Sequence, residues 1–342
     1  MNLNKKIFII GSIFYSVALV SCGGNDENLT SIQSEDEAKM VAEIYTSTLD
    51  TFILPLSRFG ENIKSSEEKN RDNLKQLILN TLQNSLKIKK LQESPFDKLS
   101  DTKDCAVSGS YSYNLQITGI NAVSGDFAFD NCDTGDSLYN GTITAFIRDF
   151  DGDENPEEFN ITFKKDFTIQ NPKGTLKFPD EFELNITGDT PDSENNIKEI
   201  FGENGISTKA YFVFDGGPIE YTKDSDKEYV SFSNLELWIN SVDPQNADVE
   251  FKIDGKLKSS NNVCSSNNFK IKVKTIKTFK TYTDSCPYQG EVDLNNGNVN
   301  ISFYSPDSDL HNPNNIKVKF NGTEIYNDDC LSLKNLPCPN QQ

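Results

Sequence analysis

The chain is poor in the residues on which most enzyme chemistry depends. It has 342 residues but one histidine, one tryptophan and two methionines. The histidine, His311, lies among Asn and Pro residues without a nucleophile motif, as a Ser-His-Asp or Cys-His arrangement would require. No C-x-x-C pair suggests a zinc site, and no phosphate-binding or dinucleotide-binding loop occurs. We therefore predict that the protein is not an enzyme and has no organic cofactor.

Positive charge is also scarce. The chain holds 33 basic and 52 acidic residues, a net charge of −19. The imbalance is uneven, because residues 101–200 contain 20 acids and 7 bases, whereas residues 201–342 contain 19 and 14. Nucleic-acid binding needs a basic surface, so we predict no nucleic-acid partner. The same excess of acid argues against charge-driven binding to anionic lipid head groups.

Long apolar runs are absent except at the N-terminus. Residues 7–20 follow Lys5 and Lys6 and have the length of a signal peptide, but are too short for a membrane-spanning helix of ~20 residues. The run ends in Leu19-Val20-Ser21-Cys22, which resembles the lipobox of bacterial lipoproteins. The resemblance implies that residues 1–21 are a lipoprotein signal peptide and that Cys22 becomes the lipidated N-terminus. A diacylglyceryl thioether, usually with a third acyl chain, would anchor the protein in a membrane. The alternatives are an ordinary secretory signal and an uncleaved anchor, and both would still export the chain.

The segment after Cys22 suggests where the anchored chain is held. Residues 22–34 are polar and glycine-rich, which predicts a flexible tether. Gly23 stands where many Gram-negative lipoproteins carry the Asp that retains them in the inner membrane. The resemblance therefore implies a lipid-anchored protein of the bacterial cell envelope, in the outer membrane rather than the inner one.

Cysteine parity agrees with lipidation. Seven cysteines become six once Cys22 is assigned to lipid, and an even number suits disulfides in an oxidising compartment. The six predicted disulfide cysteines are Cys105, Cys132, Cys264, Cys286, Cys330 and Cys338. Of the fifteen connectivities, we favour sequential pairing: 105–132, 264–286 and 330–338.

Two capping boxes predict helices in the N-terminal part of the mature chain. One is Ser34 to Glu37 and the other Ser65 to Glu68, and each precedes apolar residues at helical spacing. Pro55 and Pro95 end the two patterns. We predict an αα-hairpin over residues 35–98, with its apolar stripes packed on the rest of the protein.

From Cys105 onward the apolar period changes from 3.6 to 2. Roughly a dozen alternating runs, such as Phe159-Ile161-Phe163 and Val299-Ile301-Phe303, are separated by turn residues. Such alternation predicts antiparallel strands with one solvated face. The expected fold is α+β and mainly β, with an antiparallel β domain over residues 101–342 and a subdivision near 188–205. A sandwich, a closed barrel, and a curved sheet or half-barrel remain open.

A weak internal repeat spans the cysteine-rich regions. Cys105 and Cys132 flank two strands and precede a third, and Cys264 and Cys286 do the same. The arrangement resembles a pattern found in bacterial lipoproteins of unknown function, and it implies no activity.

Two further motifs are candidate sites. Asp149, Asp151, Asp153 and Asn155 resemble the start of a calcium loop, because oxygen ligands alternate along the chain. Glu154 replaces the glycine of that loop, and a strand rather than a helix follows, so an acidic hairpin tip is the alternative. Asn28 lies in an acidic-x-Asn-x-Thr sequence that resembles a bacterial N-glycosylation acceptor.

Three functions are compatible with these features. The first is a membrane-anchored structural or interaction module, whose partner would be another envelope protein. The second is a carrier of lipid or another hydrophobic ligand, with the helices lying in a curved sheet. The third is calcium-dependent adhesion. The interior of the β domain distinguishes the first two functions. A core filled by side chains favours the structural or interaction module, and an open apolar cavity favours the carrier.

Overall fold

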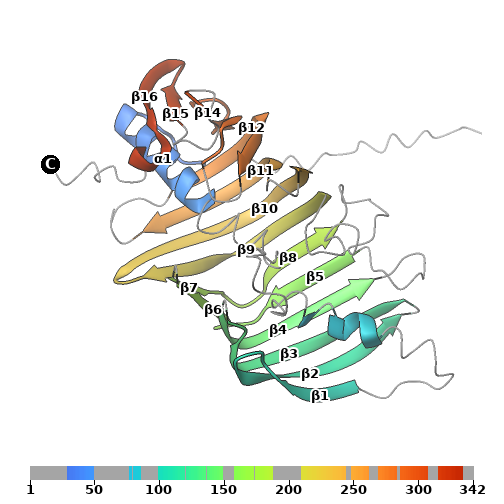
Figure 1. The fold of residues 1–342 in the computed structure, drawn as a ribbon. Coiled ribbons are helices and arrows are strands. Elements are labelled where there is room, and N and C mark those ends of the chain that lie inside the picture. Colours follow the sequence, from blue (N-terminus) through green and yellow to red (C-terminus); the bar gives the residue numbers. More distant parts are fainter. Residues whose placement is uncertain are drawn as a thin grey trace, which may run out of the picture.

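The structure is a computed structural model of the whole chain. It describes residues 29–49, 77, 78, 80–85, 99–119, 121–135, 137–148, 158–172, 174–187, 209–243, 248–261, 269–282, 286–306 and 315–333. Most described residues belong to strands of one large antiparallel sheet (Figure 1). The prediction of a mainly β protein is therefore confirmed.

Sixteen strands and two labelled helices make up the described elements. The strands are β1 (Leu99–Asp104), β2 (Ser108–Gly119), β3 (Ala122–Asp133), β4 (Leu138–Arg148), β5 (Glu158–Phe163), β6 (Thr168–Asn171), β7 (Gly174–Lys177), β8 (Phe182–Thr187), β9 (Lys209–Lys223), β10 (Asp226–Asp243), β11 (Asp248–Asn261), β12 (Phe269–Tyr282), β13 (Gln289–Leu294), β14 (Val299–Tyr304), β15 (Asn315–Phe320) and β16 (Thr323–Asp329). The helices are α1 (Glu35–Thr48) and the short α5 (Cys330–Leu333).

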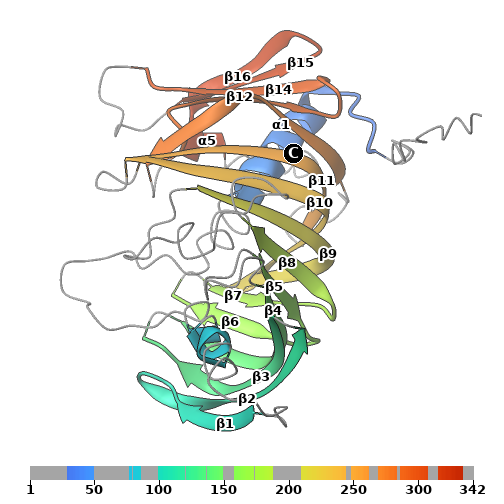
Figure 2. The ribbon, with the colours of Figure 1, turned by 90° about the vertical axis from the view of Figure 1, so that its right-hand side faces the viewer.

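The strands follow one another in the sheet almost in chain order. The order is β1-β2-β3-β4-β5-β8-β9-β10-β11-β12-β13-β14-β15-β16, and every pairing is antiparallel. Figure 2 shows that this sheet is strongly curved, with helices in its hollow. Among the described strands, the arrangement is a curved sheet whose ends are β1 and β16, rather than two stacked sheets.

The hairpin of β6 and β7 lies beside the main path. β4 pairs with β6 through residues 138–140 and with β5 through residues 143–148, while β9 pairs with both β7 and β8. Gly141, with φ +106°, separates the two halves of β4. A Cβ atom there would lie 2.9 Å from the Cα of Phe167, so glycine allows the chain to pass closely at this branch.

Alternation along the strands gives the sheet one buried face and one solvated face. In β5 the residues Phe159, Ile161 and Phe163 are fully buried, and the residues between them are partly exposed. Buried apolar side chains from strands β2 to β15 form one continuous cluster. We call the face that carries them the inner face and the opposite one the outer face.

Helix α1 packs on the inner face near the C-terminal strands. The Ser34 side chain accepts a hydrogen bond from the Glu37 backbone N–H at 3.2 Å, and this confirms the first predicted capping box. Val41, Ile44 and Tyr45 are among the buried residues of its apolar stripe. The helix contacts β14, β15 and β16.

The second helical pattern is described only in part. Residues 77, 78 and 80–85 are helical, and Leu77, Ile78 and Leu82 belong to the same buried cluster as the sheet. In both Figure 1 and Figure 2, this segment lies beside the first strands, far from α1. The predicted αα-hairpin is thus not supported, because the apolar stripes of the two segments pack on distant parts of the sheet instead of on each other.

Two disulfides are present among the described cysteines. Cys105 bonds to Cys132, with a Cα–Cα separation of 5.4 Å, as predicted. Cys286 bonds to Cys330, with a Cα–Cα separation of 6.4 Å, so the predicted pairings 264–286 and 330–338 are wrong. The sequential pairing is wrong because strands β13 to β16 bring the chain back on itself. Cys330, the first residue of α5, therefore lies beside Cys286, which precedes β13. Cys264 and Cys338 lie outside the described residues.

Two remaining expectations concern segments rather than residues. The subdivision predicted near 188–205 lies in a stretch outside the described residues, and the strands on either side of it, β8 and β9, are hydrogen-bonded neighbours. Within the described part of the chain, no helix combines the length and apolar character needed to cross a bilayer.

Candidate functional site

Most of the site residues predicted from sequence cannot be placed. Cys22 and Asn28 precede the first described residue, and the calcium candidates Asp149, Asp151, Asp153 and Asn155 fall in the gap between β4 and β5. Their roles stay predictions. Among the described residues, no three His, Cys, Asp or Glu side chains are grouped as a metal site would require.

A small cleft between α1 and the sheet is a concave feature formed by residues that the structure describes. Its lining residues come from α1, β10 and β11: Met40, Glu43, Ile44, Ser47, Thr48, Glu228 and Ser259. It encloses about 40 Å³. That is room for roughly one or two water molecules, far below the ~300 Å³ of a typical small-molecule site.

Helical spacing explains which side of α1 faces the cleft. Met40, Glu43, Ile44 and Ser47 are separated by three or four residues and therefore share one side of the helix. On the sheet, Val230 of β10 lies directly opposite Ser259 of β11. Glu228 lies two residues before Val230, so its side chain also points to the inner face.

Two glutamates and a serine give the cleft its polar character. The Ser47 hydroxyl donates a hydrogen bond to Glu228, 3.2 Å from Oε2 and 3.5 Å from Oε1. Burial raises the pKa of Glu228, against the lowering effect of the Ser47 hydrogen bond, and the charge of Asp226 raises it further. Burial first, and then the charge of Glu228, raises the pKa of Glu43 to about 7. The pair therefore gains a proton near neutral pH.

Carboxyl groups with raised pKa values are common at active sites, but they also occur in structural contacts. A glutamate with a pKa near 7 is suited to proton transfer. Here the cleft is too small for an organic substrate, and its other lining groups are apolar side chains and hydroxyls. The arrangement is best explained as a pH-sensitive contact that holds α1 against β10.

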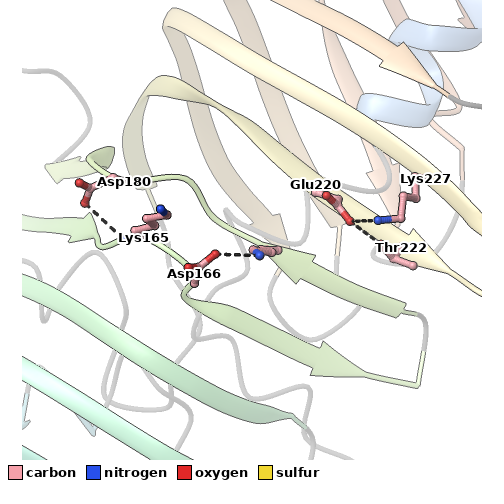
Figure 3. Close-up of polar contacts among 7 residues, drawn as sticks. Lys165, Asp166, Asp180, Glu220, Thr222 and Lys227 are labelled. Atoms are coloured by element: carbon pink, nitrogen blue, oxygen red, sulfur yellow. Dashed lines mark hydrogen bonds and ion pairs between the residues drawn. The ribbon is translucent and has the colours of Figure 1, made fainter.

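A second group of polar contacts lies where β7 meets β9. Lys177 Nζ is 2.7 Å from Asp166 Oδ1, and Lys227 Nζ is 2.6 Å from Glu220 Oε1 (Figure 3). The Lys177 partner lowers the pKa of Asp166, and Lys227 lowers that of Glu220. These are exposed ion pairs, which solvent screens and which usually contribute little to stability. They stabilise the branch of the sheet and offer no unsatisfied group for chemistry.

The cleft was not predicted from the sequence. The helical pattern identified the buried stripe of α1, and Glu43 lies directly before Ile44 of that stripe. Its partner Glu228 comes from a strand 185 positions later in the chain. A polar residue beside a buried stripe was therefore the only available signal, and it could not identify the partner.

Comparisons with known proteins give little functional information. No family model matches the chain, and no solved structure matches it. An uncharacterized protein of Aquifex aeolicus (strain VF5) is 29% identical over 238 residues. The alignment covers 65% of this chain and 64% of the relative, so the chain spans less than two thirds of that protein's length. The name of the relative describes no activity.

Proposed function

We propose that the protein is a membrane-anchored lipoprotein of the bacterial envelope, and that it acts as a structural or interaction module without enzymatic activity. The lipobox ending at Cys22 motivates the anchor, and the even number of remaining cysteines suits the oxidising envelope. Two disulfides among the described residues are consistent with that compartment. Gly23 after Cys22 favours the outer membrane.

The observation that carries this proposal is the attachment of the tether to the sheet. The Thr30 N–H donates to the Lys270 carbonyl at 3.0 Å, and the Lys270 N–H donates to Thr30 Oγ1 at 2.9 Å. The Asn295 side chain donates to the Thr30 carbonyl at 2.9 Å. The chain is thus fixed to β12 only eight residues after Cys22, so an anchor there would hold the whole sheet close to the membrane.

Packing of the inner face favours a module over a carrier. Large side chains that a carrier would expose to its ligand are fully buried here, including Phe127, Phe159, Phe214, Phe251 and Phe279. Many of these rings pack on one another, as Phe251 does on Phe279 with ring centroids 4.8 Å apart. The described inner face is therefore covered by protein, as in an ordinary core.

Cell fractionation tests the proposal. Wild-type protein expressed in a Gram-negative host should sediment with membranes and partition into detergent, whereas Cys22→Ser should appear in the soluble periplasmic fraction. Ser21→Ala is the matched control, because it keeps a small residue before Cys22 and should remain membrane-bound. Membrane association of Cys22→Ser equal to wild type would contradict the anchor. Specific turnover of a small substrate by the purified protein would contradict the non-enzymatic role.

A further inference from the structure

The outer face of β11 and β12 carries an unusual concentration of lysines. Residues 251–280 contain eight lysines and a single acid, Asp254, in a chain whose net charge is −19. Six of them alternate with inner-face residues and so share the outer face: Lys252, Lys256, Lys258, Lys270, Lys272 and Lys274. We call this group the lysine face.

The strand register places lysines directly opposite one another. Lys258 faces Lys270, and Lys256 faces Lys272. Like charges in directly opposite positions destabilise a sheet, because their Cβ atoms are only ~5 Å apart. Lys274, at one end of the face, lies opposite Asp254 on β11 and Asp293 on β13, and further along β12 Lys280 meets Glu250 at 2.7 Å. Lysines outnumber acids eight to one over residues 251–280, so the lysine face concentrates positive charge locally, and an external anion near Lys258 and Lys270 would relieve their mutual repulsion.

Amphipathic groups border the lysine face. Trp238, the only tryptophan in the chain, lies opposite Lys252 on β10, and the Lys252 ammonium is 5.3 Å from its ring centroid. Ile276 follows Lys274 on β12 and is 51% exposed, which is unusual for a large apolar side chain on this sheet. Lysine, tryptophan and an exposed aliphatic residue together are typical of surfaces that meet the membrane–water interface.

The tether joins the sheet beside the lysine face. Thr30 is hydrogen-bonded to the backbone of Lys270, a member of that face. Eight residue steps separate Thr30 from Cys22, and even a fully extended chain of that length spans at most about 28 Å. A membrane that holds acyl chains on Cys22 is therefore within reach of the lysine face.

We propose that the lysine face docks on the anionic phospholipid head groups of the membrane that holds the anchor. This inference rests on the proposed function, because the anchor supplies the proximity. Lipid anchoring combined with a basic patch is a recognised two-part mode of membrane attachment. The acid-rich strands before β9 would then face away from the bilayer. The net negative charge of the chain argues against binding to anionic lipid. Salt screens charges over ~10 Å, however, so the lysines nearest the membrane determine the local interaction.

Lysine labelling on vesicles tests the proposal with the full lipidated protein. The protein is reconstituted in vesicles of phosphatidylcholine alone or with phosphatidylglycerol at ~30%, recovered by flotation, and treated with an amine-reactive reagent. Mass spectrometry then compares each lysine. Labelling of Lys258 and Lys270 should fall by roughly threefold or more on anionic vesicles only, and high salt should restore it. Lys164 and Lys165, in the acid-rich half, should label equally on both vesicles.

Variants separate charge from proximity. A triple Lys258→Gln, Lys270→Gln, Lys272→Gln protein should float with both vesicles but lose the protection of the remaining lysines of the face. The control removes the same charge elsewhere, through Lys164→Gln, Lys165→Gln and Lys177→Gln. In this control the lysine face should keep its protection from labelling on anionic vesicles.

The outcomes distinguish the two proposals. If the protein floats with both kinds of vesicle but Lys258 and Lys270 are labelled equally on neutral and anionic vesicles, the docking of the lysine face is contradicted and the anchor stands. Flotation with anionic vesicles only would support the lysine face and overturn the anchor. Failure to float with either would overturn both.

Discussion

Glu43 and Glu228 come from distant parts of the chain and meet in one cleft, where neither is fully hydrated. The raised pKa of Glu43, about 7, means that the folded protein binds a proton there that the unfolded chain has already released. Glu43 thus favours the folded state in acid, and this contribution declines as pH rises from about 4.5 through 7. At the residue scale, the cleft makes the docking of α1 sensitive to pH.

Replacing Glu43 should remove that sensitivity. We expect Glu43→Gln to be more stable than wild type at pH 8 by about 1 kcal/mol, after allowance for solvent screening, and to differ little at pH 5. Urea unfolding at several pH values measures this. The control Asp36→Asn changes an exposed acid on the same helix and should keep the wild-type pH dependence. If the free energy of unfolding changed with pH in the same way for wild type and Glu43→Gln, the raised pKa of Glu43 would be contradicted.

Tyr45 gives a second test in the same helix. Its side chain is fully buried, and its hydroxyl has no hydrogen-bond partner among the described residues. A buried hydroxyl without a partner costs about 1–3 kcal/mol, so Tyr45→Phe should leave the protein as stable as wild type or about 1 kcal/mol more stable. Tyr45→Ala should lose about 3–5 kcal/mol, because it leaves a cavity. Thermal or urea unfolding compares the three proteins, and a strongly destabilised Tyr45→Phe would show that the hydroxyl is bonded.

At the scale of elements, the Cys286–Cys330 disulfide joins the start of β13 to the beginning of α5, directly after β16. It spans 44 residues and encloses four consecutive strands, three of which contact α1. The disulfide, rather than hydrogen bonding alone, therefore secures the C-terminal end of the sheet and the surface on which α1 packs.

Removing this disulfide should loosen that end of the protein. In the chain-entropy account, closing a loop of this length contributes about 4 kcal/mol, so Cys286→Ser with Cys330→Ser should approach that loss. Hydrogen exchange should accelerate in β13 to β16 and in α1. The matched pair Cys105→Ser with Cys132→Ser should affect β2 and β3 instead. Non-reducing peptide mapping that linked Cys286 to a cysteine other than Cys330 would contradict the pairing.

Local elements were largely predictable, and their partners were not. The Ser34 capping box and the alternating strands followed from side-chain spacing, which local geometry determines. The predicted helical hairpin is not supported, and two of the three predicted disulfide pairings were wrong. Both predictions depend on contacts between segments far apart in the chain. An apolar stripe shows that a helix is buried, but it does not show whether a helix or a sheet covers it.

At the scale of the molecule, the same limit applied to the sheet and the cleft. Strand alternation predicted an antiparallel β domain but left its closure and curvature open, because these depend on register and on the branch at β6 and β7. The Glu43–Glu228 contact could not be predicted for the same reason. The total charge also does not show how charge is distributed over the surface, since eight lysines cluster within residues 251–280 of an acidic chain.

The charge distribution gives the molecule a direction. The lysine face lies beside the attachment of the tether, whereas residues 101–200, which include strands β2 to β8, hold 20 acids and 7 bases. In our account, an anchor at Cys22 and a basic surface close to it orient one curved sheet on a membrane. The anchor is the central claim, because the proximity of the lysine face to lipid depends on it.

The intact mass of the protein extracted from bacterial membranes tests that claim most directly. The account predicts a chain that lacks residues 1–21 and begins at Cys22, with the added mass of a diacylglyceryl group and, in most molecules, a third acyl chain. A mature N-terminus at another residue, or a Cys22 without added acyl mass, would contradict it.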